Sequence, residues 1–367
     1  MLICFSILSL AVGVLACQHA HDERDVVARD SLKIAPGPSD TQIQFAPLPS
    51  TVDSPPIDPA LGYFVGNLGG GVYWVTEGVY SNMFLVSTHG VILVDAPPTI
   101  GHKLLYAIGN TTHLPVTHLV YSHLHADHIG GASLFNASRP TIIAHADTLS
   151  LLEALSPRDP LRPLPHVTFE DSYTLRVGNQ TLELSYHGPN HAAGNIFMYA
   201  PAQRVALLID VIFPGWAPFS ELAVSSFIPG WMSAHDVLLT FDFNVLVPGH
   251  LGRLGTRQDV LLQKKCKSLI HIDDTHIQDM HDSCVASING GFDVAAAIGP
   301  TVAANPGNSW AEFKAYLRAA AQTCADNTTS RWIGVLGAVD VFAFESAYRM
   351  MESVRIEVGV LGPFGVS

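Results

Sequence analysis

The chain has 367 residues, of which 48% are hydrophobic and only 14% charged, with 19 Lys and Arg against 32 Asp and Glu and a formal net charge of −13. This composition excludes disorder for most of the chain and indicates a large buried core. The negative charge repels polyanions, so no nucleic acid is expected as a partner.

The first sixteen residues are typical of a secretory signal peptide. Residues 3–15 are almost entirely apolar, and Val14, Leu15 and Ala16 fit the small-residue rule for signal-peptidase cleavage. The run is too short to span a membrane, so no stable membrane insertion is expected. The basic residues that usually precede such a run are missing. Cys17, directly after Ala16, leaves lipoprotein processing open as an alternative.

Two further features favour a secreted, extracellular glycoprotein. The sequons for N-glycosylation begin at Asn110, Asn136, Asn179 and Asn327. The cysteines that remain after cleavage are Cys17, Cys266, Cys284 and Cys324. We expect one or two disulfides, mainly among the last three, with their pairing left open by the sequence.

The chain divides by composition into four parts. After the signal peptide (residues 1–16), residues 17–60 carry prolines at 36, 38, 47, 49, 55, 56 and 59, which predicts a flexible leader or linker. A cleaved pro-segment is an open alternative. Residues 61–275 are the predicted catalytic domain, and residues 276–367 a mostly helical C-terminal extension.

Short strands and helices alternate through the predicted catalytic domain. Residues 72–77, 83–87 and 91–94 predict an antiparallel meander, followed by a helix at 101–109 and a strand at 116–122. Later strands are expected at 182–186, 205–209 and 245–247.

The strand at 116–122 runs into a cluster of metal-competent residues. His123, His125, Asp127 and His128 place three imidazoles and a carboxylate within six positions. These side chains are ligands for a divalent metal such as zinc. Because alternate residues of extended backbone point the same way, His123 and His125 can bind one ion while Asp127 and His128 turn toward a second.

Three more metal-competent residues follow other predicted strands. His191 lies in a turn-rich loop after 182–186, Asp210 ends the apolar run 205–209, and His250 follows 245–247 and a Pro-Gly pair. Taken together with the first cluster, these positions predict a two-metal site.

The order HxHxDH, His, Asp, His resembles the dinuclear metallo-β-lactamase-fold hydrolases, over roughly residues 61–275. The resemblance implies an α+β fold, the αββα sandwich of two mixed sheets with outer helices. It implies two zinc ions per chain, with iron or manganese as alternatives. By this resemblance, the first metal would be bound by His123, His125 and His191, the second by Asp127, His128 and His250, with Asp210 bridging. Asp95, which ends the strand 91–94, matches the family's acidic residue behind the metal loop and would orient the ligands.

The resemblance also implies a chemistry. A metal-bridging hydroxide would be the nucleophile, and Asp127 would steer its proton as a catalytic residue. True zinc β-lactamases of this fold generally lack an aspartate at the position of Asp210, which favours a lactone, thioester, ester or other small acyl substrate. An iron-dependent redox enzyme, a β-lactamase-like amidase and a binding protein on the same scaffold stay open as alternatives.

The segment 211–219 predicts the substrate-binding wall. It is too rich in proline and glycine for a helix, and it leaves the strand that carries Asp210. The aromatic residues expected to contact a small-molecule substrate are Phe213, Trp216 and Phe219, joined by Phe227 and Trp231. Core packing is the alternative role for these rings.

Beyond His250, helices are expected at 257–270, 309–324 and 346–354, with Ser309 as an N-cap. These helices would either close the sandwich, or cover the metal cleft or form a homodimer surface.

Overall fold

The computed structural model describes residues 44–264 and 275–364. The described residues from Phe45 onward belong to one compact unit. The predicted signal peptide, Cys17, most of the predicted linker, Cys266 and the end of the helix expected at 257–270 lie outside the described residues. The last part of that linker includes a 3-10 turn at Ser50–Val52 whose residues are not buried.

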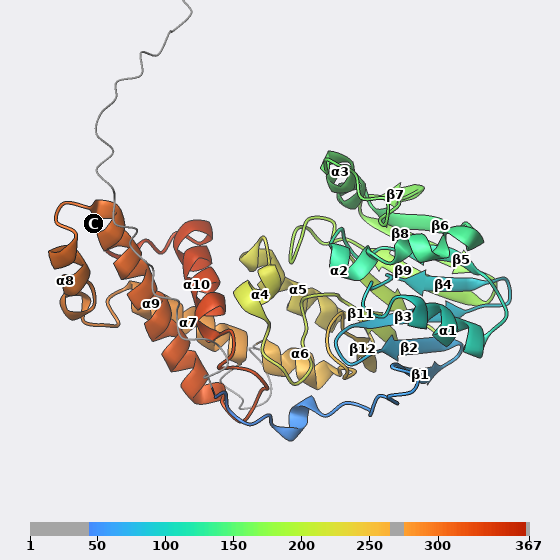
Figure 1. Cartoon of the computed structure of the whole chain (residues 1–367), viewed down its shortest axis with the longest axis horizontal. Coiled ribbons are helices and arrows are strands. Elements are labelled where there is room, and N and C mark those ends of the chain that lie inside the picture. Colours follow the sequence, from blue (N-terminus) through green and yellow to red (C-terminus); the bar gives the residue numbers. More distant parts are fainter. Residues whose placement is uncertain (1–43, 265–274, 365–367) are drawn as a thin grey trace, which may run out of the picture. The chain divides into compact units, whose positions relative to one another are not determined.

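The first sheet has seven strands (Figure 1). They are, in spatial order, β1 (Phe64–Gly69), β2 (Val72–Thr76), β3 (Ser81–Val86), β4 (Val91–Val94), β5 (Val116–Val120), β6 (Thr141–His145) and β7 (Val167–Phe169). Strands β1 to β4 pair antiparallel, and β4 to β7 pair parallel. The predicted meander is therefore confirmed as β2–β3–β4.

Strand β1 was not predicted, because its two glycines and an asparagine weaken the strand pattern. Gly66 is required there by packing, since a Cβ at this position would lie 2.9 Å from Cε3 of Trp74.

The second sheet has five strands. In spatial order they are β12 (Val245–Val247), β11 (Val205–Leu207), β10 (Phe197–Ala200), β9 (Gln180–Ser185) and β8 (Ser172–Val177). Only β11 and β12 pair parallel, and the other neighbours are antiparallel. Because β5, β11 and β12 each end at a predicted ligand loop, the two sheets bring these loops together.

The sheets face each other across a shared apolar core, with side chains such as Met83 and Val94 from the first sheet and Leu184 and Leu207 from the second. Helices α1 (His102–Thr111) and α3 (Ala146–Ala154) contribute to a cluster on the outer side of the first sheet. Helices α5 (Ile228–Thr240) and α6 (Arg257–Gln263) do the same for the second sheet. The predicted αββα sandwich is confirmed.

The C-terminal extension is helical, as predicted. Its helices are α7 (His276–Ile288), α8 (Val294–Ala304), α9 (Ser309–Trp332) and α10 (Ala343–Glu352), followed by a π-helical turn (Ser353–Glu357). Helices α7 and α8 were not predicted. Ser309 is not the N-cap: the side chain of Asn308 accepts the backbone N–H of Ala311 and caps α9.

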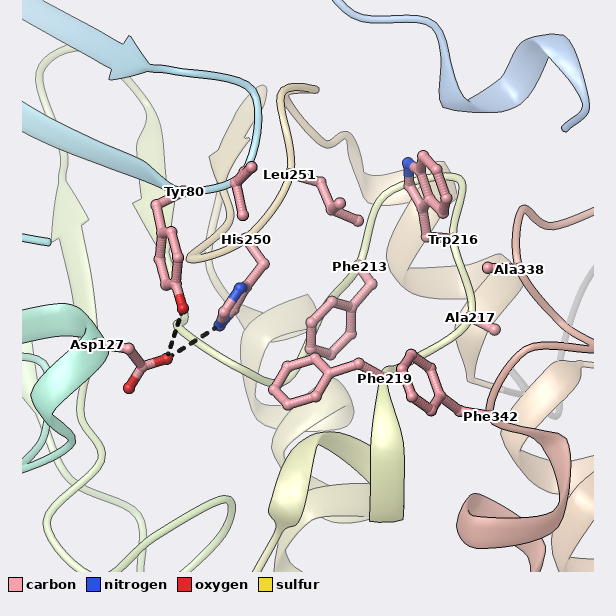
Figure 2. A pocket seen from close by; sticks show the side chains of 11 residues that line it. Tyr80, Asp127, Phe213, Trp216, Ala217, Phe219, His250, Leu251, Ala338 and Phe342 are labelled. Atoms are coloured by element: carbon pink, nitrogen blue, oxygen red, sulfur yellow. Dashed lines mark hydrogen bonds and ion pairs between the residues drawn. The ribbon is translucent and has the colours of Figure 1, made fainter. Parts of the chain in front are cut away.

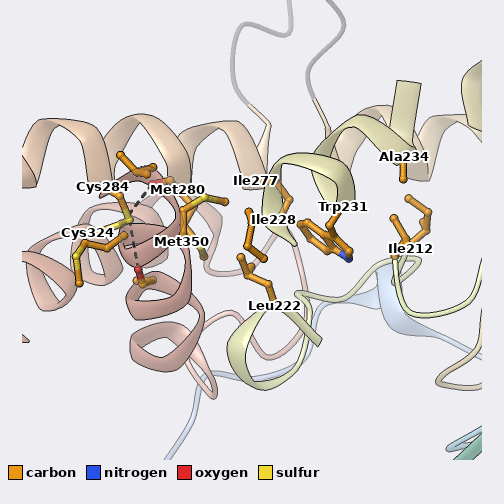
Figure 3. Packing of buried hydrophobic residues seen from close by; sticks show 14 of the residues in the cluster. Ile212, Leu222, Ile228, Trp231, Ala234, Ile277, Met280, Cys284, Cys324 and Met350 are labelled. Atoms are coloured by element: carbon orange, nitrogen blue, oxygen red, sulfur yellow. Dashed lines mark hydrogen bonds between the residues drawn. A yellow bond between two sulfur atoms is a disulfide. The ribbon is translucent and has the colours of Figure 1, made fainter. Parts of the chain in front are cut away.

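One continuous core joins this extension to the second sheet (Figure 3). Trp231 of α5 lies in the same buried cluster as Ile277 of α7, Leu317 of α9 and Met350 of α10. The extension is therefore packed onto the sandwich through apolar burial. Within residues 44–264 and 275–364, no helix is both long enough and apolar enough to cross a membrane.

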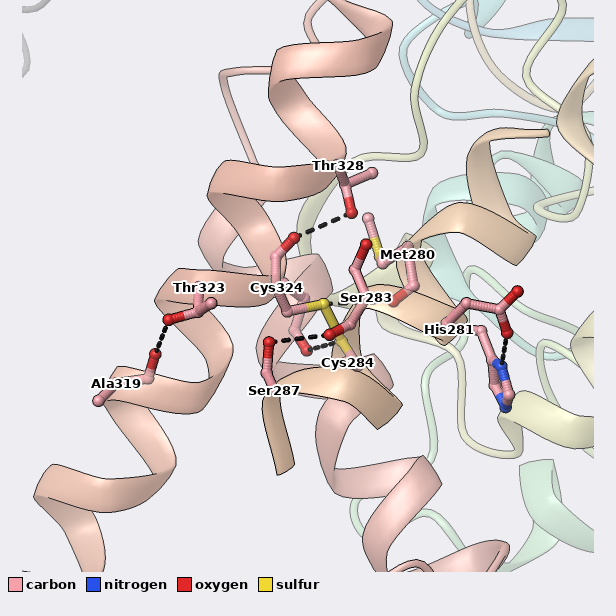
Figure 4. Close-up of a disulfide and its surroundings, with 11 residues drawn as sticks. Met280, His281, Ser283, Cys284, Ser287, Ala319, Thr323, Cys324 and Thr328 are labelled. Carbon is pink, nitrogen blue, oxygen red and sulfur yellow. Dashed lines mark hydrogen bonds and ion pairs between the residues drawn. A yellow bond between two sulfur atoms is a disulfide. The ribbon is translucent and has the colours of Figure 1, made fainter. Parts of the chain in front are cut away.

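A disulfide joins Cys284 of α7 to Cys324 of α9, two of the three cysteines expected to pair (Figure 4). Both residues are fully buried. Closing a 40-residue separation stabilises the fold by about 2–4 kcal/mol.

Because His276 is buried, the folded protein is expected to lose stability at acidic pH. It packs against Trp332, and burial lowers its pKa from 6.5 to about 4. The unfolded chain therefore binds a proton that the folded chain rejects, so the stability contribution is complete above pH 6.5 and is lost as the pH falls toward 4. We expect the melting temperature to fall less between pH 7 and pH 4.5 in His276→Phe than in the wild type. Equal losses in both proteins, measured side by side, would contradict this assignment.

Candidate metal centre

The seven predicted ligands converge at the carboxyl ends of strands from both sheets. His123 and His125 follow β5, while Asp127 and His128 lie in the short helix α2 (Ala126–Ile129) that comes next. The other three ligands are His191, which follows β9, Asp210, which follows β11, and His250, which follows β12. Asp210 adopts a left-handed backbone with φ 61°. Such conformations are uncommon outside glycine and often occur at functional sites.

The first group of ligand atoms belongs to His123, His125, His191 and Asp210, which each offer one atom within 4.8 Å of the others. Nε2 of His191 lies 2.9 Å from Nδ1 of His125 and 3.2 Å from Oδ2 of Asp210. Nε2 of His123 lies 3.5 Å from the same carboxylate oxygen. Four donors that close together surround a space suited to one ion.

The second group consists of Asp127, His128, Asp210 and His250 within the same 4.8 Å limit. Nε2 of His128 lies 3.0 Å from Oδ2 of Asp210 and 3.2 Å from Nε2 of His250. Nε2 of His250 lies 3.1 Å from Oδ1 of Asp210. Asp210 thus belongs to both groups and is placed where a bridging carboxylate would lie.

The electrostatics of the first group suit metal binding. Burial lowers the pKa of His123 well below its usual range and that of His191 to about 4, so both imidazoles are neutral and each has one nitrogen lone pair. Nε2 of His123 is buried and makes no hydrogen bond within the described residues. A buried lone pair without a donor is expected where a cation binds.

The carboxylates give the second group a negative field. Burial alone would raise the pKa of Asp210, but His128 and His191 beside it hold that pKa well below its usual range. Burial likewise opposes charge on His128, yet Asp210 and Asp127 raise the pKa of His128 to about 9. A site that favours a proton on a buried imidazole also favours a metal cation in its place. The nitrogen and oxygen donors fit zinc and similar divalent ions.

Neighbouring side chains fix the orientation of the ligands. Oγ of Ser122 lies 2.9 Å from Nδ1 of His123, and Oγ of Ser225 lies 3.4 Å from Nδ1 of His191. Asp95 is fully buried, with φ 56°, and accepts the backbone N–H of Ser122 at 2.7 Å. Burial raises the pKa of Asp95 to about 6. Asp95 therefore contacts the residue that precedes His123, and its orienting role stays a prediction.

A cavity of about 320 Å³ opens beside the second group of ligands (Figure 2). Asp127 and His250 lie at one end of it, together with Tyr80, whose hydroxyl donates to Oδ2 of Asp127 at 3.2 Å. Phe213, Trp216 and Phe219 line it as predicted, and the remaining lining residues are Val79, Ala217, Leu251, Ala338 and Phe342. Tyr80 was not predicted as a site residue, because nothing local marks a tyrosine before β3 as part of the site.

Trp231 is a correction to the predicted substrate wall, and it lies in the core. Its side chain is fully buried, its ring packs against His235, and its Nε1 donates to the carbonyl of Asp210 at 3.0 Å. It therefore supports the backbone of the bridging aspartate from behind. Phe227 is 39% exposed and does not line the cavity either.

Comparisons with known proteins point to the same family. The family model described as the metallo-beta-lactamase superfamily matches residues 76–250, which include all seven candidate ligands. The alpha subunit of 2,4-dinitroanisole O-demethylase from Nocardioides sp. (strain JS1661) is 29% identical over 192 residues, 52% of this chain and 58% of that protein. The metallo-beta-lactamase type 2 of Bacillus cereus is 27% identical over 202 residues, 54% of this chain and 73% of that protein.

A solved metallo-beta-lactamase from Pontibacter korlensis is 22% identical, with a TM-score of 0.47, and the match covers 54% of this chain and 95% of that one. The chain spans less than two thirds of the length of the demethylase subunit from Nocardioides. The family model matches residues 76–250, and the αββα sandwich brings together two groups of His and Asp residues. This chain therefore carries a domain of the metallo-β-lactamase superfamily.

Proposed function

We propose that the protein is a dinuclear metal-dependent hydrolase that cleaves a small, uncharged acyl compound such as a lactone, thioester, ester or amide. The observation that carries this proposal is the position of Asp210, whose carboxylate is shared by both groups of ligands beside an open cavity. When bound, two divalent ions supply a nucleophile at neutral pH and polarise the scissile carbonyl. Zinc is the proposed ion, with iron and manganese as alternatives.

The residues around the ions divide the remaining work. Three of the seven ligands are fully or almost fully buried imidazoles (His123, His128 and His191), and these exclude water from behind the site. Asp127 is different, because its side chain is 40% exposed and lies at the cavity. Its Oδ2 is the atom proposed to take and hold the proton of the nucleophile. The Tyr80 hydroxyl, which donates to that oxygen, fixes its position.

The cavity supports an uncharged substrate. Among the described residues that line it, the polar groups are Tyr80, Asp127 and His250, and no Lys or Arg is present to pair with an anion. The net charge of −13 disfavours anionic substrates further. The named relatives include a demethylase subunit and β-lactamases. Asp210 at the bridging position favours lactones, thioesters and esters over β-lactams, as expected from the resemblance.

A substrate panel tests the class of reaction. We expect chelator-sensitive turnover of a homoserine lactone, an uncharged thioester or an aryl ester, restored by zinc, and slower turnover of a β-lactam. Turnover that survives complete removal of metal would contradict the proposal. An absorption band from bound iron together with no hydrolysis would favour the redox alternative.

Trp216 tests the substrate wall. It lies on the cavity side of the loop that follows β11, and it is only partly buried. We expect Trp216→Ala to raise KM about tenfold with an unchanged kcat and melting temperature, because it removes apolar contact without touching a ligand. A large fall in melting temperature would instead assign this ring to the core.

We also propose that the chain is secreted and glycosylated. All four sequon asparagines, at 110, 136, 179 and 327, are exposed. The disulfide between Cys284 and Cys324 suits an oxidising compartment. Secretion from a eukaryotic host, followed by a mass shift on treatment with an N-glycosidase, would support this proposal. A chain retained in the cell without glycans would contradict it.

A further inference from the structure

The far wall of the cavity comes from a segment more than one hundred residues away in sequence from the loop it contacts. This segment, residues 333–342, joins α9 to α10 and contributes Ala338 and Phe342 to the cavity. Trp216 forms a bridge with Gly337, where the N–H of Ala217 donates to the carbonyl of Gly337 at 3.0 Å. The N–H of Gly337 donates in turn to the carbonyl of Gly215 at 2.9 Å. We name residues 333–342 the distal wall.

The distal wall is held tightly against that loop. A Cβ at Gly337 would lie 2.9 Å from Cε3 of Trp216 and 2.5 Å from Cγ1 of Val52, so only glycine permits this approach. Leu336 and Val339 form a small buried cluster with Trp332, against which Ala217 packs. The wall is therefore fixed in place and is not a loose loop.

Residues 45–54 hold the distal wall from its other side. The N–H of Ala46 donates to Oδ2 of Asp340 at 2.7 Å, and the hydroxyl of Thr51 donates to the carbonyl of Val335 at 3.0 Å. Ala338 keeps a left-handed backbone with φ 57°. Such a conformation in a residue other than glycine persists only where the surroundings enforce it.

The cavity has a polar end and an aromatic end. Figure 2 shows Tyr80, Asp127 and His250 together, and Trp216, Ala338 and Phe342 away from them. Between the two ends the rings of Phe213 and Phe219 lie 5.7 Å apart at an interplanar angle of 87°. The ring of Phe219 is 4.9 Å from that of His250, so aromatic surface continues up to a candidate metal ligand.

The size and chemistry of this space select one class of group. A volume of about 320 Å³ is at the small end of ligand pockets, which hold roughly 300–1,000 Å³. The part of a substrate that this cavity encloses is therefore small, about the size of a single ring with a short acyl group. Ring edges and faces at right angles favour an aromatic guest, which pairs edge-to-face or offset-stacked.

We infer that the distal wall determines specificity, and that the preferred substrate carries one aromatic ring next to its scissile acyl group, as in an aryl ester or aryl amide. The carbonyl lies toward Asp127 and His250, and the ring lies between Trp216, Phe219 and Phe342. This inference rests on the proposed function. Phe342 is 37% exposed and lies at the rim, so it is a residue for substrate contact and not for core stability.

The test compares phenyl, cyclohexyl and ethyl acetate in wild type and Phe342→Ala. We expect Phe342→Ala to raise KM for the phenyl ester about tenfold with an unchanged kcat. KM for ethyl acetate should stay the same, and Phe342→Tyr, which keeps the ring, should restore phenyl selectivity. Because each ester is compared between proteins, differences in its intrinsic reactivity cancel. Tyr106→Ala is the control, since Tyr106 of α1 is 64% exposed and does not line the cavity.

Equal changes for all three esters, or no change for any, would overturn the role of the distal wall. If Phe342→Ala lowers the melting temperature, the esters are compared in Phe342→Leu, which keeps apolar volume without a ring. Binding of acetophenone, measured by calorimetry, tests the ring site without turnover. If wild type hydrolyses none of the esters, the proposed function fails for esters. The distal-wall inference still stands if acetophenone binds at least tenfold more weakly to Phe342→Ala, and falls if the two proteins bind it equally.

Discussion

Asp210→Asn is expected to lose bound metal and to reduce kcat by at least about a thousandfold. The carboxylate of Asp210 is shared by both groups of ligands and is 2% exposed, and its pKa is held well below its usual range mainly by His128. Asparagine keeps the size and one oxygen but removes the negative charge that both groups of ligands share. Elemental analysis and steady-state turnover of the purified variant measure the two effects.

The matched control is Asp242→Asn. Asp242 is 78% exposed and pairs with Arg204 at the surface, so its charge is expected to contribute little. Full metal content with near-normal turnover in Asp210→Asn would refute the shared-ligand role. Equal losses in the control would show that the effect is general instability.

Asp127→Asn is expected to lower kcat by two to four orders of magnitude, roughly the contribution of a positioned proton acceptor, while most of the metal remains bound. Asp127 lies at the edge of the second group, and only this acidic ligand reaches the cavity. His128, Asp210 and His250 remain to bind the second ion. Metal content must be measured on the same sample, because loss of the ion would imitate loss of the proton acceptor. Near-normal turnover with both ions bound would contradict the role given to Asp127.

The ligand set was accessible from the sequence because each ligand follows a strand. A buried strand and the loop that leaves it are both local patterns, and the carboxyl ends of β5, β11 and β12 carry His123, Asp210 and, after a Pro-Gly turn, His250. The resemblance then supplied the order of the ligands. The fold brings the seven residues together in two groups that share Asp210.

The substrate wall was only partly accessible from the sequence, because it depends on which way a helix faces and on distant pairing. Trp231 was assigned to the cavity from its place after Asp210, but the face of α5 that carries it turns toward the core. Phe342 was not predicted, because the pairing between Trp216 and Gly337 joins segments far apart in sequence and has no local sequence pattern. Tyr80 was missed for the same reason.

The C-terminal helices show a further limit. Helix α8 is apolar on nearly every side and contains Gly299 and Pro300, so its sequence has no distinct apolar stripe and carries two residues that disfavour a helix. Helix α7 carries polar residues such as Asp279 and Ser283 on its buried side, which hides its pattern. The extension was expected either to close the sandwich or to cover the metal cleft. It packs on the second sheet through the core around Trp231, and through the distal wall it also lines the cavity.

The most direct test of the central claim is the metal content of the purified protein, measured together with its hydrolytic turnover before and after chelation. The proposed function predicts two zinc ions per chain in a colourless protein, loss of acyl hydrolysis when both are removed, and recovery when zinc is restored. A protein that binds no metal at these seven residues, or that hydrolyses its substrate equally well without metal, would contradict it.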